Sequence, residues 1–524
     1  MRFAAILLVL FVATVNLAHT QQASSRQASS QQASSQQAAK PDSGSSTQPA
    51  HPQEDPLADA QPVTTHHQLT VGGKALKYTA TAGRISIKPE NGPTEAAIFF
   101  TAYTLDGEDA RTRPVTFVFN GGPGTSTAWL HMGAFGPKKI KLEKDGGVPA
   151  PPYQTVDNPD TLLDRTDLVF IDAPGTGYSR VRPDLTKKFY NIAGDADAFY
   201  RFIRTYLSRY QRWRSPLFLF GESYGTTRAA ALANHLTDNY IPVRGVALLS
   251  VGIDFQTLMP GNMNDLPHQV IVPSYTMIAA YHKKLSPELT SDLDATIKKV
   301  KQWCATDYAQ SLALGNALPA ERRKQIVAQL ATYTGLKPDV IEENDLRIEP
   351  TVFMHNLLKE QKLEVGRVDG RVAAPAPQSN AHEPFYDPAM AAMFPAFNAA
   401  MNDYAEYDLN YKSELPYIVW DYEGINHAWD WSTGINGYPQ TATALQSAMA
   451  KNKFLKVLVM EGMYDLATPF YASAYTFQHL RLNADYRRNI TFADFKSGHM
   501  VYTDAVASGE MKRTLDAWYQ SMGQ

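Results

Sequence analysis

The chain has only one cysteine, Cys304, among its 524 residues. It therefore cannot form an intramolecular disulfide bond, even in an oxidising compartment. Cysteine and histidine residues do not cluster with the spacing of a metal site, so we expect neither a metal nor another cofactor. The residues around Cys304 have the periodicity of an apolar helix face, which predicts a thiol packed in a core.

An excess of charge of either sign is also missing. The 49 basic and 52 acidic residues give a formal net charge of −3. This balance provides no bulk field to attract nucleic acid or an anionic membrane surface, so we predict neither partner. No motif specifies an oligomeric state. With 44% hydrophobic residues the chain can bury a large core, in one α/β domain with an insertion or in two or three domains.

The first residues have the pattern of a secretory signal peptide. Arg2 precedes an apolar run from Phe3 to Ala13, and small and polar residues follow near Ala18. The run is too short to span a membrane comfortably, and no cysteine near its end could carry a lipid. We therefore predict a signal peptide over residues 1–20 and an exported protein, periplasmic or secreted, without a membrane anchor. A buried N-terminal helix is the alternative.

Residues 21–62 cannot bury an apolar face. Four near-copies of a pentapeptide, QQASS, RQASS, QQASS and QQAAK, precede a stretch rich in Ser, Pro, Gln and His. This composition predicts a disordered linker, rich in Gln, Ala and Ser, without chemistry of its own.

Two patterns of apolar residues then follow. Between about residues 68 and 100, alternation interrupted by glycine and proline predicts antiparallel strands. From Pro114, short apolar runs alternate with helical segments, as expected for a mostly parallel sheet covered on both faces. The predicted strands of this sheet are 115–119, 168–171, 217–220, 246–250, 454–460 and 489–493. The clearest helix extends from about residue 195 to residue 213.

The alternation stops between residues 255 and 439. Amphipathic helical patterns dominate there, and residues 365–379 have the composition of a loop. We predict an α/β core in two parts, residues 63–254 and 440–524, with a largely helical cap inserted over residues 255–439. An independent domain in the insertion is the alternative.

The motif GESYG at residues 221–225 follows the predicted strand 217–220 and precedes a helical segment. This order of strand, tight turn and helix is typical of a nucleophile elbow, in which glycines leave room for a strained serine with an exposed hydroxyl. Ser223 is therefore the candidate nucleophile. The motif alone is a weak signal, so the prediction depends on the other candidate residues in the chain.

A serine nucleophile needs a histidine base, and the histidine needs a carboxylate that fixes its tautomer and stabilises its cation. After such an elbow, the acid and the histidine are expected on loops that follow late strands. Asp465 follows the strand 454–460, and His499 follows the strand 489–493. Each residue alone would more commonly be structural, but their order makes them the candidate acid and base.

The strand 115–119 ends in a glycine-rich turn, Asn-Gly-Gly-Pro-Gly-Thr-Ser, over residues 120–126. Backbone N–H groups of such a turn can point at the negative charge that develops in acyl transfer. The alternatives are a simple tight turn and a phosphate-binding loop, whose Gly-Lys-Ser/Thr ending is missing here.

With these motifs, the chain resembles the serine carboxypeptidase family of α/β-hydrolases, and its bacterial branch in particular. Five motifs carry the resemblance, in family order: NGGPGTS at 120–126, DAPGTGYS at 172–179, GESYG at 221–225, GMYDLATP at 462–469 and GHM at 498–500. They cover the chain from about residue 65 to its end. The resemblance implies an α/β-hydrolase fold with a mostly parallel central sheet, N-terminal antiparallel strands and a helical cap.

By this resemblance, Ser223, Asp465 and His499 match the family's catalytic triad. The backbone N–H groups of Gly122 and Tyr224 match its oxyanion hole. The implied activity is that of a serine-type carboxypeptidase, which removes C-terminal residues from peptides with a free C-terminus through an acyl-enzyme.

Asn120 and Glu222 match the positions that bind the substrate's C-terminal carboxylate in the family. Met500 matches an apolar residue of the leaving-group pocket. Glu222 beside a carboxylate is a like-charge pair, so binding should require one shared proton and an acidic preference should follow. A purely structural role for Glu222 in the elbow is the alternative.

The chain departs from the family pattern at three positions. Ala134 aligns with a glutamate of the carboxylate-binding network, Thr125 replaces a half-cystine, and Thr226 replaces a glycine. The missing glutamate favours an alternative function, an esterase or acyltransferase that uses the same triad. A non-catalytic protein with a peptide groove is the third hypothesis, against which the intact triad residues count.

Overall fold

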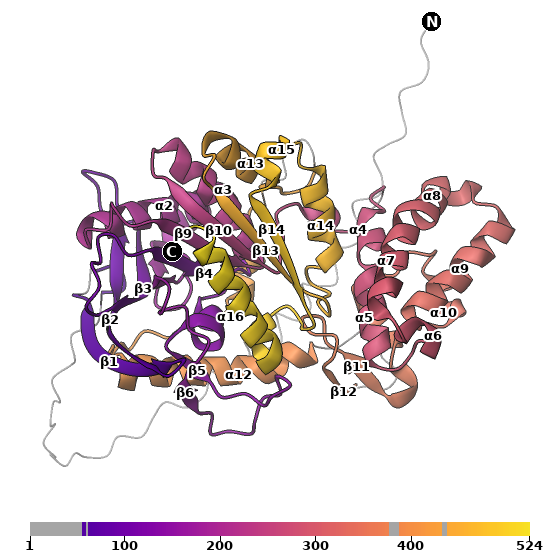
Figure 1. Ribbon diagram of the computed structural model, residues 1–524, viewed down its shortest axis with the longest axis horizontal. Helices are drawn as coiled ribbons and strands as arrows, with labels where there is room; N and C mark the ends of the chain where they lie inside the picture. The colour runs from indigo at the N-terminus through magenta and orange to yellow at the C-terminus, as the bar shows by residue number, and fades with distance from the viewer. Residues whose placement is uncertain (1–54, 59–60, 262, 377–386, 432–436, 524) are drawn as a thin grey trace, which may run out of the picture. The chain divides into compact units, whose positions relative to one another are not determined.

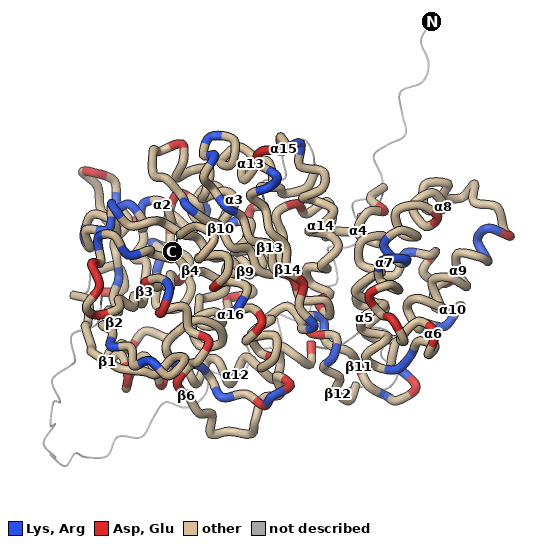
Figure 2. The backbone as a smooth tube through the Cα atoms, viewed as in Figure 1, with Lys and Arg blue, Asp and Glu red and all other residues tan. Residues whose placement is uncertain are grey.

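The computed structural model describes residues 55–58, 61–261, 263–376, 387–431 and 437–523 (Figure 1). The predicted signal peptide, residues 1–20, and the predicted linker as far as residue 54 lie outside the described residues, so both stay predictions. Figure 2 shows basic and acidic residues interspersed along the described chain, in keeping with its small net charge.

A ten-stranded sheet forms the centre of the described chain (Figure 1). Its strands lie side by side in the order β1 (Val63–Val71), β2 (Lys74–Ile87), β3 (Ala96–Leu105), β7 (Asp167–Ile171), β4 (Val115–Phe119), β9 (Leu217–Glu222), β10 (Val243–Leu249), β13 (Lys456–Gly462) and β14 (Ile490–Phe495), and β8 (Arg180–Val181) pairs with β3. Strands β1 to β3 are antiparallel, and the six from β7 to β14 are parallel. With helices on both faces, this is the α/β-hydrolase fold, which confirms the predicted fold class.

Both faces of the parallel strands are buried. Along β9, Leu217 and Leu219 belong to the apolar cluster that includes α2, α3 and α13. Phe218 and Phe220 belong to the cluster on the other face, which includes α12 and α16. Because side chains alternate between the faces, a strand covered on both sides has a continuous apolar sequence. This is why the parallel strands could be predicted from short apolar runs.

Seven helices accompany the sheet among the described core residues: α1 (Thr186–Phe189), α2 (Ile192–Arg209), α3 (Tyr224–Asp238), α13 (Ala442–Lys451), α14 (Phe470–His479), α15 (Ala484–Arg487) and α16 (Ala505–Gln520). Helix α2 is the predicted helix, but it begins and ends earlier than its apolar pattern indicates. The side chain of Asn191 caps its first turn by accepting a hydrogen bond from the Gly194 amide. The chain leaves the helical conformation by Gln211, which has a φ of 56°.

The segment between β10 and β13 is mostly helical. It contains α4 (Leu266–Val270), α5 (Val272–Tyr281), α6 (Pro287–Thr290), α7 (Leu293–Trp303), α8 (Ala309–Leu314), α9 (Ala320–Thr334), α10 (Pro338–Glu343), α11 (Pro350–Asn356) and α12 (Pro388–Asp403). Helices α5, α7, α9 and α11 share an apolar cluster with Tyr464, Leu466 and Phe470 from the second part of the core. Cys304 is buried in this cluster, as its sequence context predicted. None of the described helices is both long and apolar enough to cross a bilayer.

The loop predicted over residues 365–379 is partly wrong. Strand β11 (Leu363–Val365) pairs with β12 (Ala373–Pro375) in an antiparallel hairpin. The pairing brings together two short strands, and one of them contains a proline, so neither has a distinct apolar alternation. A second hairpin joins β5 (Lys138–Ile140) and β6 (Thr155–Asp157).

Short helical turns complete the described elements. The π-helical turns are η1 (Leu130–Phe135), η4 (Cys304–Tyr308), η7 (Tyr404–Asp408) and η8 (Tyr422–Asn426), and the 3-10 turns are η2 (Pro183–Leu185), η3 (Phe255–Thr257), η5 (Gly315–Ala317), η6 (Lys359–Gln361) and η9 (Val501–Thr503).

The packing of α16 on the sheet generates a test of the fold. A Cβ atom at Gly245 of β10 would lie 2.6 Å from Trp518 and 2.7 Å from Phe218, so no side chain fits there. We expect Gly245→Ala to lower the free energy of unfolding by about 1–3 kcal/mol through overpacking. Gly509→Ala, within α16, is the control; its Cβ would meet only the Arg513 side chain, 3.5 Å away, and should be neutral or slightly stabilising. Urea denaturation compares the two, and equal midpoints would contradict this packing.

Candidate active site

Ser223 lies on the sharp turn between β9 and α3. Strand β9 ends at Glu222 and α3 begins at Tyr224, which leaves Ser223 as the single residue of the turn. Its φ of 58° and ψ of −130° are strained for a residue with a side chain, at a cost of about 1–3 kcal/mol. The Ser223 amide donates to Leu249 O at 2.9 Å, which ties the turn to the neighbouring strand. This is the geometry of the predicted nucleophile elbow.

Glycines let three backbone segments approach one another around this turn. A Cβ atom at Gly221 would lie 2.1 Å from Gly225 O, and one at Gly225 would lie 2.8 Å from Phe119 O. The turn that follows β4 is equally close, since a Cβ atom at Gly121 would lie 2.4 Å from the Tyr224 amide nitrogen. The glycines of both motifs are therefore required by packing, and they bring the turn after β4 against the elbow.

His499 and Asp465 meet on the loops that follow β14 and β13. Nδ1 of His499 lies 2.6 Å from Oδ2 of Asp465, and Asp465 is fully buried. The other donors to Asp465 are the amides of Ala467 and Thr468 and the hydroxyl of Thr468, whose oxygen is 2.6 Å from Oδ2. These contacts fix the carboxylate, and the carboxylate in turn fixes the imidazole through Nδ1, so Nε2 is the nitrogen left for a reacting group.

The environment of His499 favours its cation. Burial alone would lower the pKa of His499, but the charge and hydrogen bond of Asp465 and the charge of Glu222 outweigh it, so the pKa is raised above its ordinary value. A histidine held in this way accepts a proton more readily than a free one.

Asn120 and Glu222 form a buried polar pair beside the elbow. Nδ2 of Asn120 donates to Oε2 of Glu222 at 3.0 Å, and Oδ1 of Asn120 accepts from the Leu130 amide at 3.0 Å. The hydroxyl of Tyr502 is 3.2 Å from Oε1 and 3.0 Å from Oε2 of Glu222. Burial raises the pKa of Glu222 to about 7, although His499, Tyr502 and Asn120 each lower it. Glu222 can therefore carry a proton near neutral pH.

A cavity of about 570 Å³ opens onto these groups. All the predicted site residues except Asp465 line it: Asn120, Gly122, Glu222, Ser223, Tyr224, His499 and Met500. The rest of the lining is mainly apolar and aromatic, and includes Trp129, Phe255, Met390, Phe394, Trp420 and Trp431. The cavity is therefore suited to a largely apolar molecule, although Arg367 and Asp387 of the insertion also line it.

The aromatic lining was missed by sequence reasoning. Phe394 stacks on Trp420 with ring centroids 5.3 Å apart and packs edge-on against Trp129 at 5.1 Å. The segment around Trp420 is paired with the turn after β4, since the Ser126 amide donates to Val419 O at 2.9 Å. These aromatic residues come from three distant segments, and no pattern in the sequence brings them together. The density of tryptophan and tyrosine between residues 417 and 431 marks only the segment of Trp420 as unusual.

A buried ion pair supports the turn after β4, because one of its partners binds the backbone of that turn. Nε of Arg228 lies 2.8 Å from Oδ2 of Asp195, and both side chains are buried. The guanidinium also donates to Asn120 O and lies 4.6 Å from the centre of the Phe199 ring. The same carboxylate accepts from the Tyr224 hydroxyl at 3.3 Å. This network joins α2, α3 and the turn that carries Asn120.

The helical insertion contacts the loop of His499 directly. The His499 amide donates to Val368 O at 2.6 Å, and a Cβ atom at Gly498 would lie 2.5 Å from the side chain of Asp369. Arg371 bridges Asp369, at 2.7 Å, and Asp504, at 2.8 Å. Residues 366–371 therefore hold the histidine loop in place through backbone and side-chain contacts.

Comparison with known protein families identifies the family of this chain. The family model described as serine carboxypeptidase matches residues 75–513. The chain belongs to the serine carboxypeptidase family. It is 26% identical to serine carboxypeptidase-like 33 of Arabidopsis thaliana over 165 residues, which are 31% of this chain and 32% of the plant protein. The chain thus aligns with about a third of that relative's length.

Two solved structures that are similar to this serine carboxypeptidase family member have low sequence identity to it. Esterase E22 matches with a TM-score of 0.36 and 14% identity, over 84% of this chain and 100% of that chain. Proline iminopeptidase of Mycobacterium smegmatis matches with a TM-score of 0.33 and 12% identity, over 87% and 98% of the two chains.

Family membership confirms the predicted resemblance to serine carboxypeptidases and supports a serine hydrolase, whereas the bacterial branch stays a prediction. The roles of the individual residues stay predictions. At the position of the missing glutamate, Ala134 lies buried in η1 and contributes no carboxylate. The polar contacts of Glu222 come instead from Asn120 and Tyr502.

The raised pKa of Glu222 generates a stability test. An acid whose pKa rises on folding, here from 4.5 to about 7, destabilises the folded state once the pH exceeds 4.5, and the cost is complete above pH 7. We expect Glu222→Gln to raise the free energy of unfolding at pH 8 by about 1–3 kcal/mol and to change it little at pH 5. Urea denaturation at both pH values measures this, with the exposed Glu321→Gln as control. An equal effect at both pH values would show that Glu222 is not buried with a raised pKa.

Proposed function

We propose that this serine hydrolase is an exported serine-type carboxypeptidase, which removes C-terminal residues from peptides. The observation that carries the proposal is the buried pair of Asn120 and Glu222 next to Ser223. A neutral Glu222 can donate its proton to a substrate carboxylate, and the Asn120 amide can donate a second hydrogen bond. A carboxylate bound there would bring the last peptide bond of the substrate to Ser223.

In the proposed first step, Ser223 Oγ attacks the carbonyl carbon of that bond. His499 Nε2 takes the hydroxyl proton, and Asp465 stabilises the imidazolium that forms. The carbonyl oxygen becomes an oxyanion, which accepts hydrogen bonds from the amides of Gly122 and Tyr224. All of these groups except Asp465 line the same cavity, which supports this assignment.

In the second step, His499 donates the proton to the leaving amine and the C–N bond breaks. The C-terminal residue leaves past Met500, and the shortened peptide remains as an ester on Ser223. Water then attacks the ester with His499 as the base, which releases the peptide and restores the Ser223 hydroxyl. No step calls for a metal or an organic cofactor.

Three segments complete the proposal. Residues 1–20 would direct export and residues 21–62 would tether the folded part. Residues 255–439 would form a cap whose apolar lining selects side chains of the peptide. Most residues of this range that line the cavity are apolar, such as Phe255, Phe394 and Trp420, beside the charged Arg367 and Asp387. This majority supports a preference for apolar residues beside the cleaved bond.

An esterase or acyltransferase with the same catalytic residues is the second candidate. The observation that favours it is Ala134, which leaves the carboxylate-binding region with one glutamate. A substrate without a free carboxylate would then need only the elbow, the histidine and the apolar cavity.

The nucleophile assignment generates the first functional prediction. Ser223→Ala should reduce kcat/KM by at least about 1,000-fold for peptides and for esters, because no other hydroxyl replaces the attacking oxygen. The control is Ser274→Ala, which removes a buried hydroxyl in α5 that makes no hydrogen bond among the described residues. Covalent labelling by an organophosphonate, followed by peptide mapping, should locate the adduct on Ser223. Retained hydrolysis in Ser223→Ala would mean that another residue is the nucleophile.

The carboxylate site generates the second functional prediction. One peptide is compared with a free and with an amidated C-terminus. Below pH 7, where Glu222 is mostly neutral, we expect the free form to be favoured in kcat/KM by at least about 100-fold. Above pH 7 the KM of the free peptide should rise about tenfold per pH unit, because Glu222 and the substrate are then both anionic. Equal turnover of both peptides would remove the carboxypeptidase proposal, and preference for small esters at every pH would support the second candidate.

A further inference from the structure

Tyr502 is a buried tyrosine that contacts Glu222 but is not one of the cavity-lining residues. It lies on η9, three residues after His499, and outside every motif of the sequence. Its hydroxyl reaches both carboxylate oxygens of Glu222, at 3.2 and 3.0 Å, and 3% of the residue is exposed. Tyr502 therefore approaches Glu222 from the protein interior, whereas a substrate enters through the cavity.

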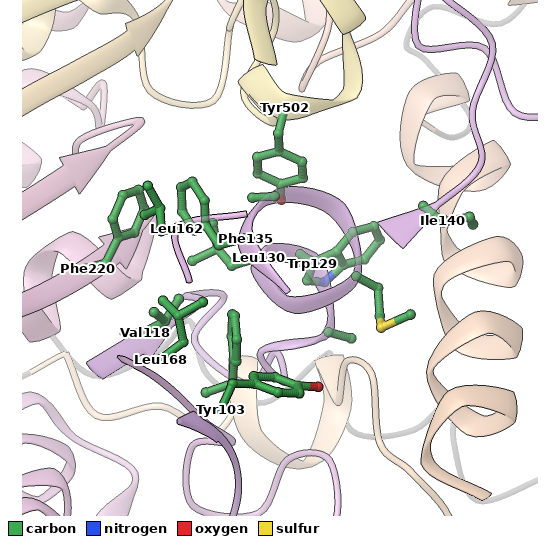
Figure 3. Close-up of a cluster of buried hydrophobic side chains, with 14 of the residues drawn as sticks. Tyr103, Val118, Trp129, Leu130, Phe135, Ile140, Leu162, Leu168, Phe220 and Tyr502 are labelled. Carbon is green, nitrogen blue, oxygen red and sulfur yellow. The ribbon is translucent and has the colours of Figure 1, made fainter. Parts of the chain in front are cut away.

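The ring of Tyr502 packs where a glycine leaves room for it. A Cβ atom at Gly133 would lie 2.5 Å from Cε2 of Tyr502, so only glycine allows the ring to lie against η1. Figure 3 shows Tyr502 beside the helical turn that carries Leu130 and Phe135. The same turn holds Asn120, because the Leu130 amide donates to its Oδ1. The π-helical turn η1 thus fixes both side chains that donate to Glu222.

The two donors are not equivalent. Asn120 lines the cavity, so its Nδ2 group can also donate to a substrate while Oδ1 stays bound to the Leu130 amide. Tyr502 does not line the cavity, because its ring is enclosed against η1, and its hydroxyl stays beside Glu222 and Asn120. Burial and the nearby charge of Glu222 raise the pKa of Tyr502, so the phenol keeps its proton and remains a donor. A donor that stays in place when Glu222 binds a substrate holds the carboxyl group in one orientation.

We propose that Tyr502 is a positioning residue for substrate binding, which orients Glu222 and sets the pH above which a free C-terminus no longer binds. This inference rests on the proposed function of Glu222 as the group that binds the substrate carboxylate. It assigns a role to the hydroxyl of Tyr502 that is separate from the packing of its ring.

The direction of the effect follows from the hydrogen bond. An ionised carboxylate gains more from a donor than a neutral carboxyl group does, so the Tyr502 hydroxyl lowers the pKa of Glu222. Removing the hydroxyl should therefore keep Glu222 neutral to a higher pH. For the free-carboxylate peptide, the pH at which KM begins to rise should then move upward by about one unit. The looser Glu222 should also raise KM several-fold at pH 5.5.

The test compares Tyr502→Phe with Tyr519→Phe. The control removes a similarly buried hydroxyl, which lies 2.8 Å from the Thr116 hydroxyl and makes no contact with Glu222. KM and kcat are measured from pH 5 to pH 9 for a blocked dipeptide with a free C-terminus, for its amide, and for an N-acyl amino-acid p-nitrophenyl ester without a carboxylate. Only Tyr502→Phe, and only with the free dipeptide, should show the upward shift of the KM profile. Ester hydrolysis should stay within about twofold of the wild type.

The outcomes separate this inference from the proposed function. If the wild type does not discriminate the free dipeptide from its amide, the proposed function fails before Tyr502 is at issue. If the wild type discriminates them but the KM profile of Tyr502→Phe matches that of Tyr519→Phe, the positioning role is overturned. An equal loss of activity by Tyr502→Phe on all three substrates would also overturn it, because the hydroxyl would then support the fold of the site in general.

Discussion

The close approach of two backbone turns is the constraint on which the site depends. Strands β4 and β9 are parallel neighbours, so the turns at their carboxyl ends meet at the same edge of the sheet. At Gly121 there is no room for a side chain, because a Cβ atom would lie 2.4 Å from the Tyr224 amide nitrogen. This contact is what allows Ser223, Glu222 and Asn120 to share one cavity, and the ion pair of Arg228 with Asp195 supports it from the core.

The same region holds groups that do not favour the folded state. Ser223 has a positive φ, and Glu222 is a carboxyl group with 2% of its surface exposed. Both are tolerated because neighbouring elements fix them: α3 and the Leu249 carbonyl fix the elbow, and Asn120 and Tyr502 bind the carboxyl group. A strained backbone residue next to a buried carboxyl group is typical of sites that were selected for activity rather than for stability.

The sequence predicts the fold and the glycine-rich turns better than the lining of the cavity. Parallel strands covered on both faces appear as apolar runs, and the elbow and the turn after β4 require glycines for local steric reasons. The order of the motifs also predicts Asp465 and His499, which the structure places 2.6 Å apart. Trp129, Phe394 and Trp420 could not be predicted, because tertiary packing alone brings these distant residues together. The π-helical turn η1 was missed as well, since its residues have no distinctive pattern.

The contact of residues 366–371 with the histidine loop limits how the insertion can change. If the insertion touched the core only through its helices, another insertion could replace it by recombination without disturbing the loop of His499. Here Val368 O accepts the amide of His499, and Arg371 reaches Asp504 beyond it, so a transplanted insertion without these residues would leave the histidine loop unsupported. Variation among homologous insertions should therefore be concentrated in the outer helices, while the segment beside His499 should change together with the α/β core.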